Sequence, residues 1–178
     1  MTDAVSRFVS NATAAGSEVV ELKTLGECFK RVVEVLQVEG VKHVSVQPSS
    51  ATAPLYEMLR GMGYNVVSPA AGIKPLSVVE AGISPAELGI AETGTVVVAT
   101  DSEAARLVSA LPLINIILLD KSNIIESLVD AHRWVRGFIS KGYAVSFITG
   151  PSKTGDIELK MVKGVHGPHR VLVFIHES

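Results

Sequence analysis

The sequence predicts an α/β fold with a mostly parallel, Rossmann-like sheet flanked by helices, and three observations support this prediction. Short apolar segments alternate with longer segments of helical periodicity, a pattern that favours βαβ units. Residues 96–98, 114–119 and 144–148 are apolar almost throughout, which is typical of buried strands. The hydrophobic fraction of 47% and the mean hydropathy of +0.36 fit a large buried interior. The length of 178 residues is most simply one domain, residues 1–178.

The first half of the chain predicts helices and short strands in turn. Thr24 and Glu27 form a capping-box signature ahead of an apolar-periodic segment, so a helix is expected to begin there and to stop at Gly40. Pro54 suits the first turn of the next helix. Two prolines and a glycine make residues 68–75 a predicted loop. The helices expected here cover residues 2–15, 24–40 and 54–60, and the strands cover residues 18–22, 41–47 and 65–67.

The second half predicts a hairpin followed by alternating helices and strands. Ser84 and Glu87 form another cap signature, which predicts a very short helix, and residues 88–100 predict strand, turn and strand. The remaining helices are expected at residues 102–110 and 122–140, and the remaining strands at residues 114–119, 144–148, 157–163 and 170–176. No helix separates the last two strands, which predicts an antiparallel addition at a sheet edge near the C-terminus. The longest helix is expected to turn its apolar side chains inward, namely Ile124, Ile125, Leu128, Val129, Val135 and Ile139.

Composition argues against several classes of protein. The net charge of −2, the absence of a basic stripe and the aromatic fraction of 5% argue against a nucleic-acid partner. The single cysteine, Cys28, excludes a disulfide within the chain and a cysteine-ligated zinc or iron–sulfur site made by this chain alone. Residues 1–8 lack the apolar core of a secretory signal, and no apolar run is long enough to span a membrane, so a cytoplasmic protein is expected.

The first candidate site is the loop at residues 149–156, which follows the apolar run at residues 144–148. Backbone N–H groups of a glycine-rich loop, hydroxyls and an ammonium group could together hold a phosphate or a carboxylate. The candidate ligand-binding residues are Gly150, Ser152, Lys153, Thr154, Gly155 and Asp156. The spacing matches neither a P-loop nor a dinucleotide fingerprint, so no cofactor is expected. An ordinary solvated turn remains an equal alternative.

The second candidate site is the turn at residues 91–95, Ala-Glu-Thr-Gly-Thr, which precedes a valine-rich run. A carboxylate such as that of Glu92 acts as a nucleophile or a base when burial or neighbouring groups tune it. Thr93, Gly94 and Thr95 would then help to bind the ligand. The alternative is a surface turn in which Gly94 supplies a positive φ angle.

The third candidate is the segment at residues 164–169, which places His166 and His169 on either side of a Gly-Pro pair. A helix would bring two such histidines onto one face, but the proline at 168 prevents that helix, so no metal site is expected. His166 is instead a candidate for hydrogen bonding or proton transfer.

Four stretches together resemble the LUD family, the lactate-utilisation proteins of the LutC type. They are residues 91–95, 111–112, 148–158 and 164–168. The resemblance is close over residues 80–178, whereas the first half matches in pattern and length. It implies the fold of the NagB/RpiA/CoA-transferase-like superfamily, which agrees with the alternating pattern described above.

The resemblance also implies a role in the oxidation of L-lactate to pyruvate, in which partner proteins carry the iron–sulfur clusters. One cysteine fits a companion protein that holds no cluster itself. The implied pocket combines Glu92, residues 93–95, the loop at residues 150–156 and His166, with Lys153 facing a small anionic ligand that resembles lactate, CoA or a nucleotide. Glu92 or His166 would accept any proton that moves.

Two other functions remain open. CoA-transferases of the superfamily use a glutamate in a Glu-x-Gly setting as acyl nucleophile, and Glu92-Thr93-Gly94 looks like that setting. The chain could alternatively be a regulatory module that binds a small molecule without chemistry. The high apolar fraction also makes a homo-oligomer or a partner interface a reasonable expectation.

Overall fold

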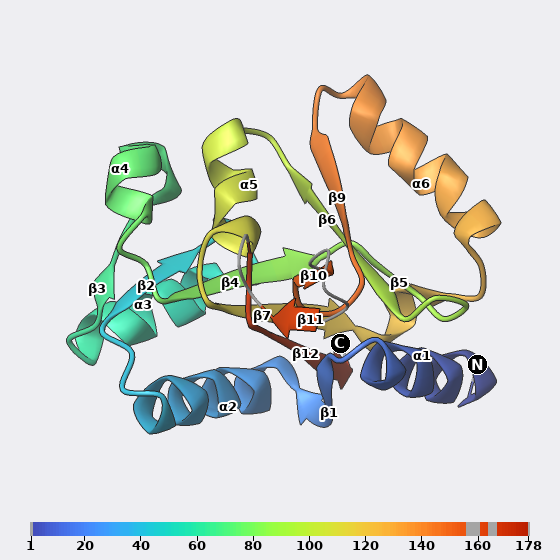
Figure 1. The fold of residues 1–178 in the computed structure, drawn as a ribbon, viewed down its shortest axis with the longest axis horizontal. Helices are drawn as coiled ribbons and strands as arrows, with labels where there is room; N and C mark the ends of the chain where they lie inside the picture. The colour runs from blue at the N-terminus through green and yellow to red at the C-terminus, as the bar shows by residue number, and fades with distance from the viewer. Residues whose placement is uncertain (1, 156–160, 164–166, 178) are drawn as a thin grey trace.

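The computed structural model describes residues 2–155, 161–163 and 167–177, and its centre is a six-stranded sheet in which all strands are parallel (Figure 1). The strand order is β1-β12-β7-β4-β2-β3. These strands are β1 Glu18–Thr24, β2 His43–Val46, β3 Asn65–Val66, β4 Ala81–Ala86, β7 Ile114–Asp120 and β12 Arg170–Glu177. The predicted α/β class with a mostly parallel sheet is confirmed.

A second sheet of four strands lies beside the first, in the order β8-β5-β6-β9. Its strands are β5 Leu88–Ile90, β6 Thr95–Thr100, β8 Ile124–Ile125 and β9 Ala144–Ile148. Antiparallel pairing of β5 with β6 confirms the expected hairpin, and β9 pairs antiparallel with β6. A separate antiparallel pair joins β10 Lys153–Gly155 to β11 Met161–Lys163.

Helices cover both faces of the parallel sheet (Figure 1). They are α1 Thr2–Ala14, α2 Leu25–Val38, α3 Ala53–Gly61, α4 Ile73–Leu76, α5 Glu103–Ala110 and α6 Leu128–Ser140, with 3₁₀ turns at Pro69–Ala71 and Lys121–Asn123. On one face α2 and α3 bury Phe29, Leu36 and Leu55 against the sheet. On the other face α1 buries Phe8 against the inner strands and β6. None of the described helices combines the length and the apolar character that crossing a membrane requires.

The predicted start of α2 is confirmed in atomic detail. The Thr24 hydroxyl accepts a hydrogen bond from Glu27 N at 3.2 Å, and the Glu27 carboxylate accepts one from Lys23 N at 2.8 Å. The helix ends at Val38, and Gly40 follows with a φ of +66°. These bonds satisfy backbone donors that the first turn of a helix leaves without partners.

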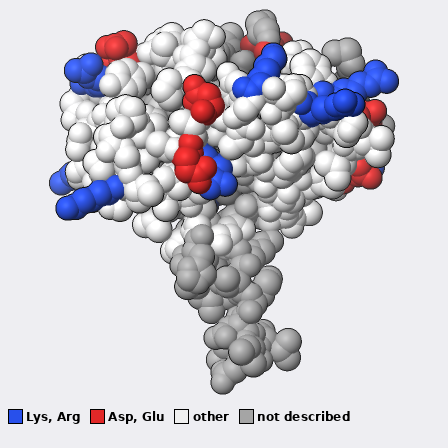
Figure 2. Space-filling model, turned by 90° about the horizontal axis from the view of Figure 1, so that it is seen from above, with Lys and Arg blue, Asp and Glu red and all other residues white. Residues whose placement is uncertain are grey.

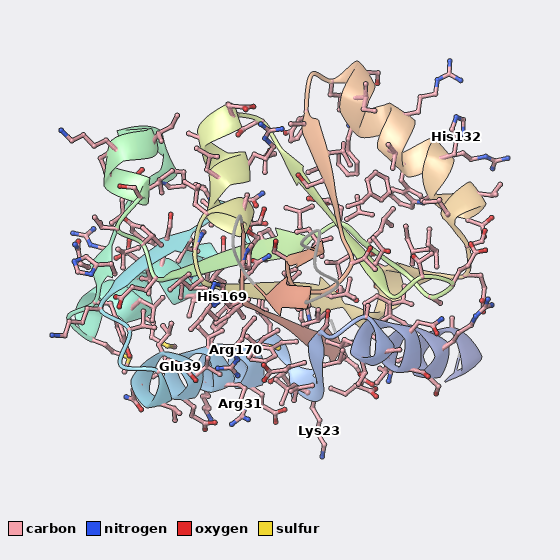
Figure 3. All side chains as sticks on the ribbon, in the orientation of Figure 1. Lys23, Arg31, Glu39, His132, His169 and Arg170 are labelled. Carbon is pink, nitrogen blue, oxygen red and sulfur yellow. The ribbon has the colours of Figure 1, made fainter. Side chains whose placement is uncertain are left out.

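An ion-pair cluster fixes the start of β12 to its neighbours. Arg170 donates two hydrogen bonds of 2.7 Å to Glu18 of β1 and also pairs with Glu39 at the end of α2 (Figure 3). These bonds hold the pKa of the Glu18 carboxyl below its usual value. Glu18 and Arg170 are the first residues of β1 and β12 and are far apart in sequence, so this cluster helps to set the register of the two parallel strands.

The place of β12 corrects one expectation. Residues 170–176 were expected at an antiparallel edge, but β12 is an inner strand that pairs parallel with both β1 and β7. The physical reason is burial on both faces, since residues 171–176 are all buried. The antiparallel element near the C-terminus is the β10–β11 pair, which forms a sheet of its own. Of the strand expected at residues 157–163, the described part is β11.

The cap signature at Ser84 was also misleading. Ser84 lies inside β4, where its neighbours pair with both β2 and β7, and it is completely buried. Pairing on both sides outweighs a local preference that is worth about 1 kcal/mol. The loop expected at residues 68–75 likewise contains a 3₁₀ turn and α4.

The helix expected over residues 122–140 begins only at Leu128, because β8 pairs with β5 first and Ser127 then caps α6. Its expected inward face is largely wrong: the side chains of Leu128, Val129 and Ile139 are 50%, 81% and 59% exposed. The helix rests only on the small second sheet, so Ala131 is its one buried residue. For the same reason β9, expected to be buried, is a half-buried edge strand.

The surface that carries α4, α5 and α6 shows acidic and basic side chains interspersed among uncharged ones (Figure 2). No stripe of one sign runs across this face. The interior contains Cys28, and burial raises the pKa of its thiol to about 11.

Candidate functional site

The structure brings two of the predicted motifs together. The turn at residues 91–95 and the residues after β9 meet because β6 and β9 are paired, with Val96 opposite Ile148. The Thr95 hydroxyl lies 2.6 Å from the Thr93 hydroxyl and 2.7 Å from the Thr149 hydroxyl. Three hydroxyls from two segments that are far apart in sequence thus form one hydrogen-bonded chain.

Both motif glycines lie against the end of α1. Gly94 has a φ of +65°, and a Cβ atom there would come within 2.1 Å of Ala12 N. Gly150 has a φ of +76°, and a Cβ atom there would come within 2.3 Å of Ala15 O. Only glycine fits such a close approach with a positive φ. Each glycine therefore has a structural reason in addition to any ligand that it binds.

Glu92 is exposed at the start of α6. Its carboxylate accepts a hydrogen bond from Leu128 N at 3.0 Å, and its backbone N–H donates to Glu126 O at 2.9 Å. The Asn11 amide holds the same turn by donating to the carbonyls of Ala91 and Glu92. A carboxylate at a helix N-terminus is stabilised by the unpaired N–H groups there. The geometry therefore gives Glu92 a capping role, and its chemical role stays a prediction.

The rest of the predicted loop runs to the edge of the parallel sheet where the strands have their amino ends. Ser152 N donates to Pro168 O at 2.9 Å, next to the amino ends of β7 and β12. Lys153, Thr154 and Gly155 make up strand β10. The side chains of Lys153 and Thr154 lie outside the described part of the structure. Asp156 and His166 also lie outside the described residues. Ligand sites of open parallel sheets lie at the carboxyl ends of the strands. This loop follows an antiparallel edge strand, so that preference does not place it at such a site.

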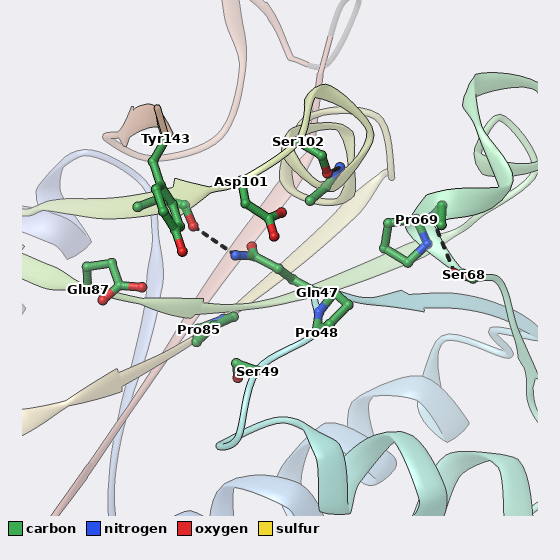
Figure 4. A pocket seen from close by; sticks show the side chains of 13 residues that line it. Gln47, Pro48, Ser49, Ser68, Pro69, Pro85, Glu87, Asp101, Ser102 and Tyr143 are labelled. Atoms are coloured by element: carbon green, nitrogen blue, oxygen red, sulfur yellow. Dashed lines mark hydrogen bonds between the residues drawn. The ribbon is translucent and has the colours of Figure 1, made fainter. Parts of the chain in front are cut away.

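A cavity that the sequence did not reveal lies at the carboxyl ends of β2 and β4 (Figure 4). Its volume is about 560 Å³, which is within the usual range for sites of small molecules. We name it the switch-point pocket. Its lining residues come from five segments of the chain: Gln47, Pro48, Ser49, Ser68, Pro69, Ala70, Pro85, Glu87, Ala99, Asp101, Ser102, Ala105 and Tyr143.

The position of this pocket follows from the strand order. From β2 the chain passes through α3 to β3 on one side, whereas from β4 it passes through the β5–β6 hairpin and α5 to β7 on the other. Adjacent parallel strands whose connections diverge leave a crevice outside their carboxyl ends, and ligands of open α/β sheets bind there. The polar residues that follow residues 41–47 were a sequence signal for a site at the end of β2. The end of β4 was not predicted as part of that site, because Ser84 and Glu87 were expected to begin a short helix.

The lining of the switch-point pocket includes two carboxylates and one buried amide. Gln47 is 6% exposed; its Nε2 donates to Ala99 O at 2.9 Å, and its Oε1 has no partner among the described residues. Glu87 is half-buried, and burial raises the pKa of its carboxyl. Asp101 is an exposed carboxylate at the rim. The negative charge of these oxygen atoms favours a cation in the cavity.

A metal-binding cluster is not evident in the described ranges, where no three His, Cys, Asp or Glu side chains gather.

Comparison with known proteins settles the family. The profile of the LUD domain matches residues 5–176. The chain belongs to the LUD domain family. This membership confirms the resemblance seen in the motifs.

The LUD chain is also similar to curated proteins and to a solved structure. It is 39% identical over 100 residues to Lactate utilization protein C of Bacillus subtilis, a match that covers 54% of this chain and 42% of that protein. For the protein of the same name from Geobacillus thermodenitrificans the identity is 37% over 98 residues, covering 53% and 41%. The matches thus span less than half the length of these relatives. A DUF162 family protein from Deinococcus radiodurans shares the fold, with a TM-score of 0.73 at 18% identity over 98% of this chain and 97% of that one.

We expect Glu87→Gln to raise the free energy of unfolding of the LUD chain at neutral pH. Burial raises the pKa of the Glu87 carboxyl above its ordinary value of 4.5, because the charged form loses water. A carboxyl with a raised folded pKa contributes stability that is full below the unfolded pKa and is lost as pH rises through the folded pKa. The gain should therefore be larger at about pH 7 than at about pH 4. Urea unfolding at both pH values measures it.

The matched control is Glu57→Gln, which removes the same charge from an exposed position on α3. We expect no comparable pH-dependent gain from this variant. If Glu87→Gln gives the same change in stability at both pH values, Glu87 is not desolvated in the folded protein.

Proposed function

We propose that this LUD protein is a component of a cytoplasmic system that oxidises L-lactate to pyruvate. The observation that carries the proposal is its similarity, at 37–39% identity, to the two proteins named Lactate utilization protein C. The oxidation releases two electrons and two protons. The chain has one cysteine, which is buried, so we assign the electrons to iron–sulfur clusters of partner proteins.

The proposed ligand site is the cluster of motifs around the threonine hydroxyls. It combines Thr93, Gly94, Thr95, Gly150 and the loop at residues 152–156, with a small anion such as lactate as the ligand. The hydrogen-bonded chain of Thr93, Thr95 and Thr149 supports this proposal, because it holds the two loops at a fixed spacing. Lys153 would pair with the anion, and Glu92 or His166 would accept the proton of the lactate hydroxyl.

The test is growth of the source organism on L-lactate after deletion of the gene. We expect the deletion strain to lose growth on L-lactate and to keep growth on pyruvate, because only the oxidation step is missing. The tagged protein from wild-type cells should co-purify with cysteine-rich iron–sulfur proteins and with lactate-oxidising activity. Normal growth of the deletion strain on L-lactate would contradict the proposal.

Site variants sharpen this test inside the complex. Lys153→Ala should raise the KM for L-lactate, because the ammonium group pairs with the carboxylate in the ground state. Lys23→Ala is the control, since this side chain projects into solvent from the end of β1 (Figure 3). Equal KM values for the two variants would move the anion site elsewhere.

A further inference from the structure

The switch-point pocket has a chemistry that differs from that of an anion site. Two carboxylates, those of Glu87 and Asp101, line it, and no Lys, Arg or His is among its thirteen lining residues. Neither carboxylate has a hydrogen bond or an ion pair with another side chain in the described part of the chain. Uncompensated negative charge in a crevice repels carboxylates and phosphates and attracts cations.

We propose that the switch-point pocket binds a small organic cation that carries primary ammonium or guanidinium donors. The proposal goes beyond the role in lactate oxidation and does not depend on it. The site, the ligand class and the residues that would recognise it all follow from the lining of this one cavity.

Gln47 is the independent sign that a cation belongs in this pocket. Its side chain is almost fully buried, and the bond from Nε2 to Ala99 O fixes which way the amide points. The atom left without a partner is therefore the acceptor Oε1. Figure 4 shows the Asp101 carboxylate pointing toward this amide. The Oε1 atom is covered by its neighbours and does not contact a ligand directly, but its partial negative charge and the charge of the Asp101 carboxylate together favour a cation in the cavity.

The remaining walls suit the carbon skeleton and the charge of such a ligand. Pro48, Pro69 and Pro85 present apolar surface from three different segments. Tyr143 closes one side, and its ring is braced by Phe138 at 6.0 Å between centroids. An aromatic face attracts a cation. The volume of about 560 Å³ leaves room for an alkyl chain beyond a single ammonium group.

The test uses agmatine, which carries an ammonium and a guanidinium group on a four-carbon chain. Isothermal titration calorimetry with the purified full chain at neutral pH should show binding of agmatine, weakened by added salt. Two probes serve as controls: 1,4-butanediol has the same carbon chain without charge, and L-lactate is an anion. We expect no binding of 1,4-butanediol, and we expect agmatine to bind with the same affinity in the presence of L-lactate, because the proposed lactate site is elsewhere on the chain. Absence of agmatine binding, or agmatine binding no tighter than that of 1,4-butanediol, would overturn the proposal.

Variants then assign the binding to the pocket. We expect Glu87→Gln and Asp101→Asn each to weaken agmatine binding by about tenfold, because each removes one charged acceptor. Glu103→Gln removes the same charge from the first residue of α5 without touching the lining, and it should leave the affinity unchanged. If both lining variants bind agmatine like wild type, the cation sits elsewhere and the proposal fails. Asp101 is exposed, so its variant tests the charge of the lining without changing a buried side chain.

The binding assay is independent of lactate oxidation. A deletion strain that grows normally on L-lactate would overturn the proposed function and leave agmatine binding untouched. Conversely, a pocket that ignores agmatine would leave the growth result unaffected.

Discussion

Gly94→Ala is expected to destabilise the protein by about 2–4 kcal/mol, which is a large part of the stability of a typical domain. The added Cβ would lie 2.1 Å from Ala12 N and 2.4 Å from Asn11 C, both backbone atoms of α1. Since backbone cannot rotate away as a side chain does, the turn and the helix must separate. A φ of +65° adds the strain of a left-handed conformation, about 1 kcal/mol for alanine.

The control for this variant is Gly40→Ala. Gly40 has nearly the same φ, +66°, but a Cβ atom there meets nothing within 4 Å. The control therefore carries the backbone strain alone and should cost about 1 kcal/mol. Urea unfolding of both variants measures the difference, which isolates the contact with α1. Equal losses would show that the turn at residues 91–95 does not lie against α1.

Loss of Gly94 should also affect the motif cluster. The turn positions Thr93 and Thr95, whose hydroxyls are linked to Thr149. Displacement from α1 would break the hydrogen bonds that Asn11 donates to the carbonyls of Ala91 and Glu92. The turn would then lose both of its fixed supports on α1.

Phe174→Ala is expected to cost about 3–5 kcal/mol and to lower the melting temperature by roughly 10 °C or more. Phe174 is 0% exposed on inner strand β12, where it belongs to the core that α2 covers. Truncation removes most of the buried ring and leaves a cavity between the sheet and α2. Close packing prevents the neighbours from filling that cavity completely.

Phe147→Ala makes the same chemical change at the edge. Phe147 lies on β9 and is 47% exposed, so its truncation should cost about 1 kcal/mol or less. Thermal and urea unfolding compare the two variants directly. A loss at Phe174 as small as that at Phe147 would place β12 at an exposed edge, contrary to the structure.

Local patterns in the sequence were enough to predict the class of the fold and most of its elements. Runs such as residues 114–119 are apolar on both faces, and only a strand covered on both sides buries such a run. Thr24 and Glu27 marked the start of α2, because capping is a contact between residues three apart. The hairpin at residues 88–100 was predictable for the same reason: its pairing is local.

Which strands are neighbours depends on contacts between distant parts of the chain, and these contacts exist only in the folded protein. The apolar run at residues 170–176 indicated a strand but not its partners, since pairing with β1 and β7 joins residues that are far apart in sequence. Local periodicity also could not show that α6 lies on a small sheet and leaves Val129 in solvent. The cap signature at Ser84 failed because pairing on both sides of β4 outweighs a local contact.

The two candidate sites also differ in how much of each could be predicted from local sequence. The motif residues Thr93, Thr95 and Gly150 were recognisable in the sequence because a turn is specified by a few consecutive residues. Their contact with α1 and with each other depends on the pairing of β6 with β9. The switch-point pocket was not predicted, because five separate segments line it and none of them carries a motif. A crevice at diverging connections exists only once the strand order is set, and that order is a property of the folded chain.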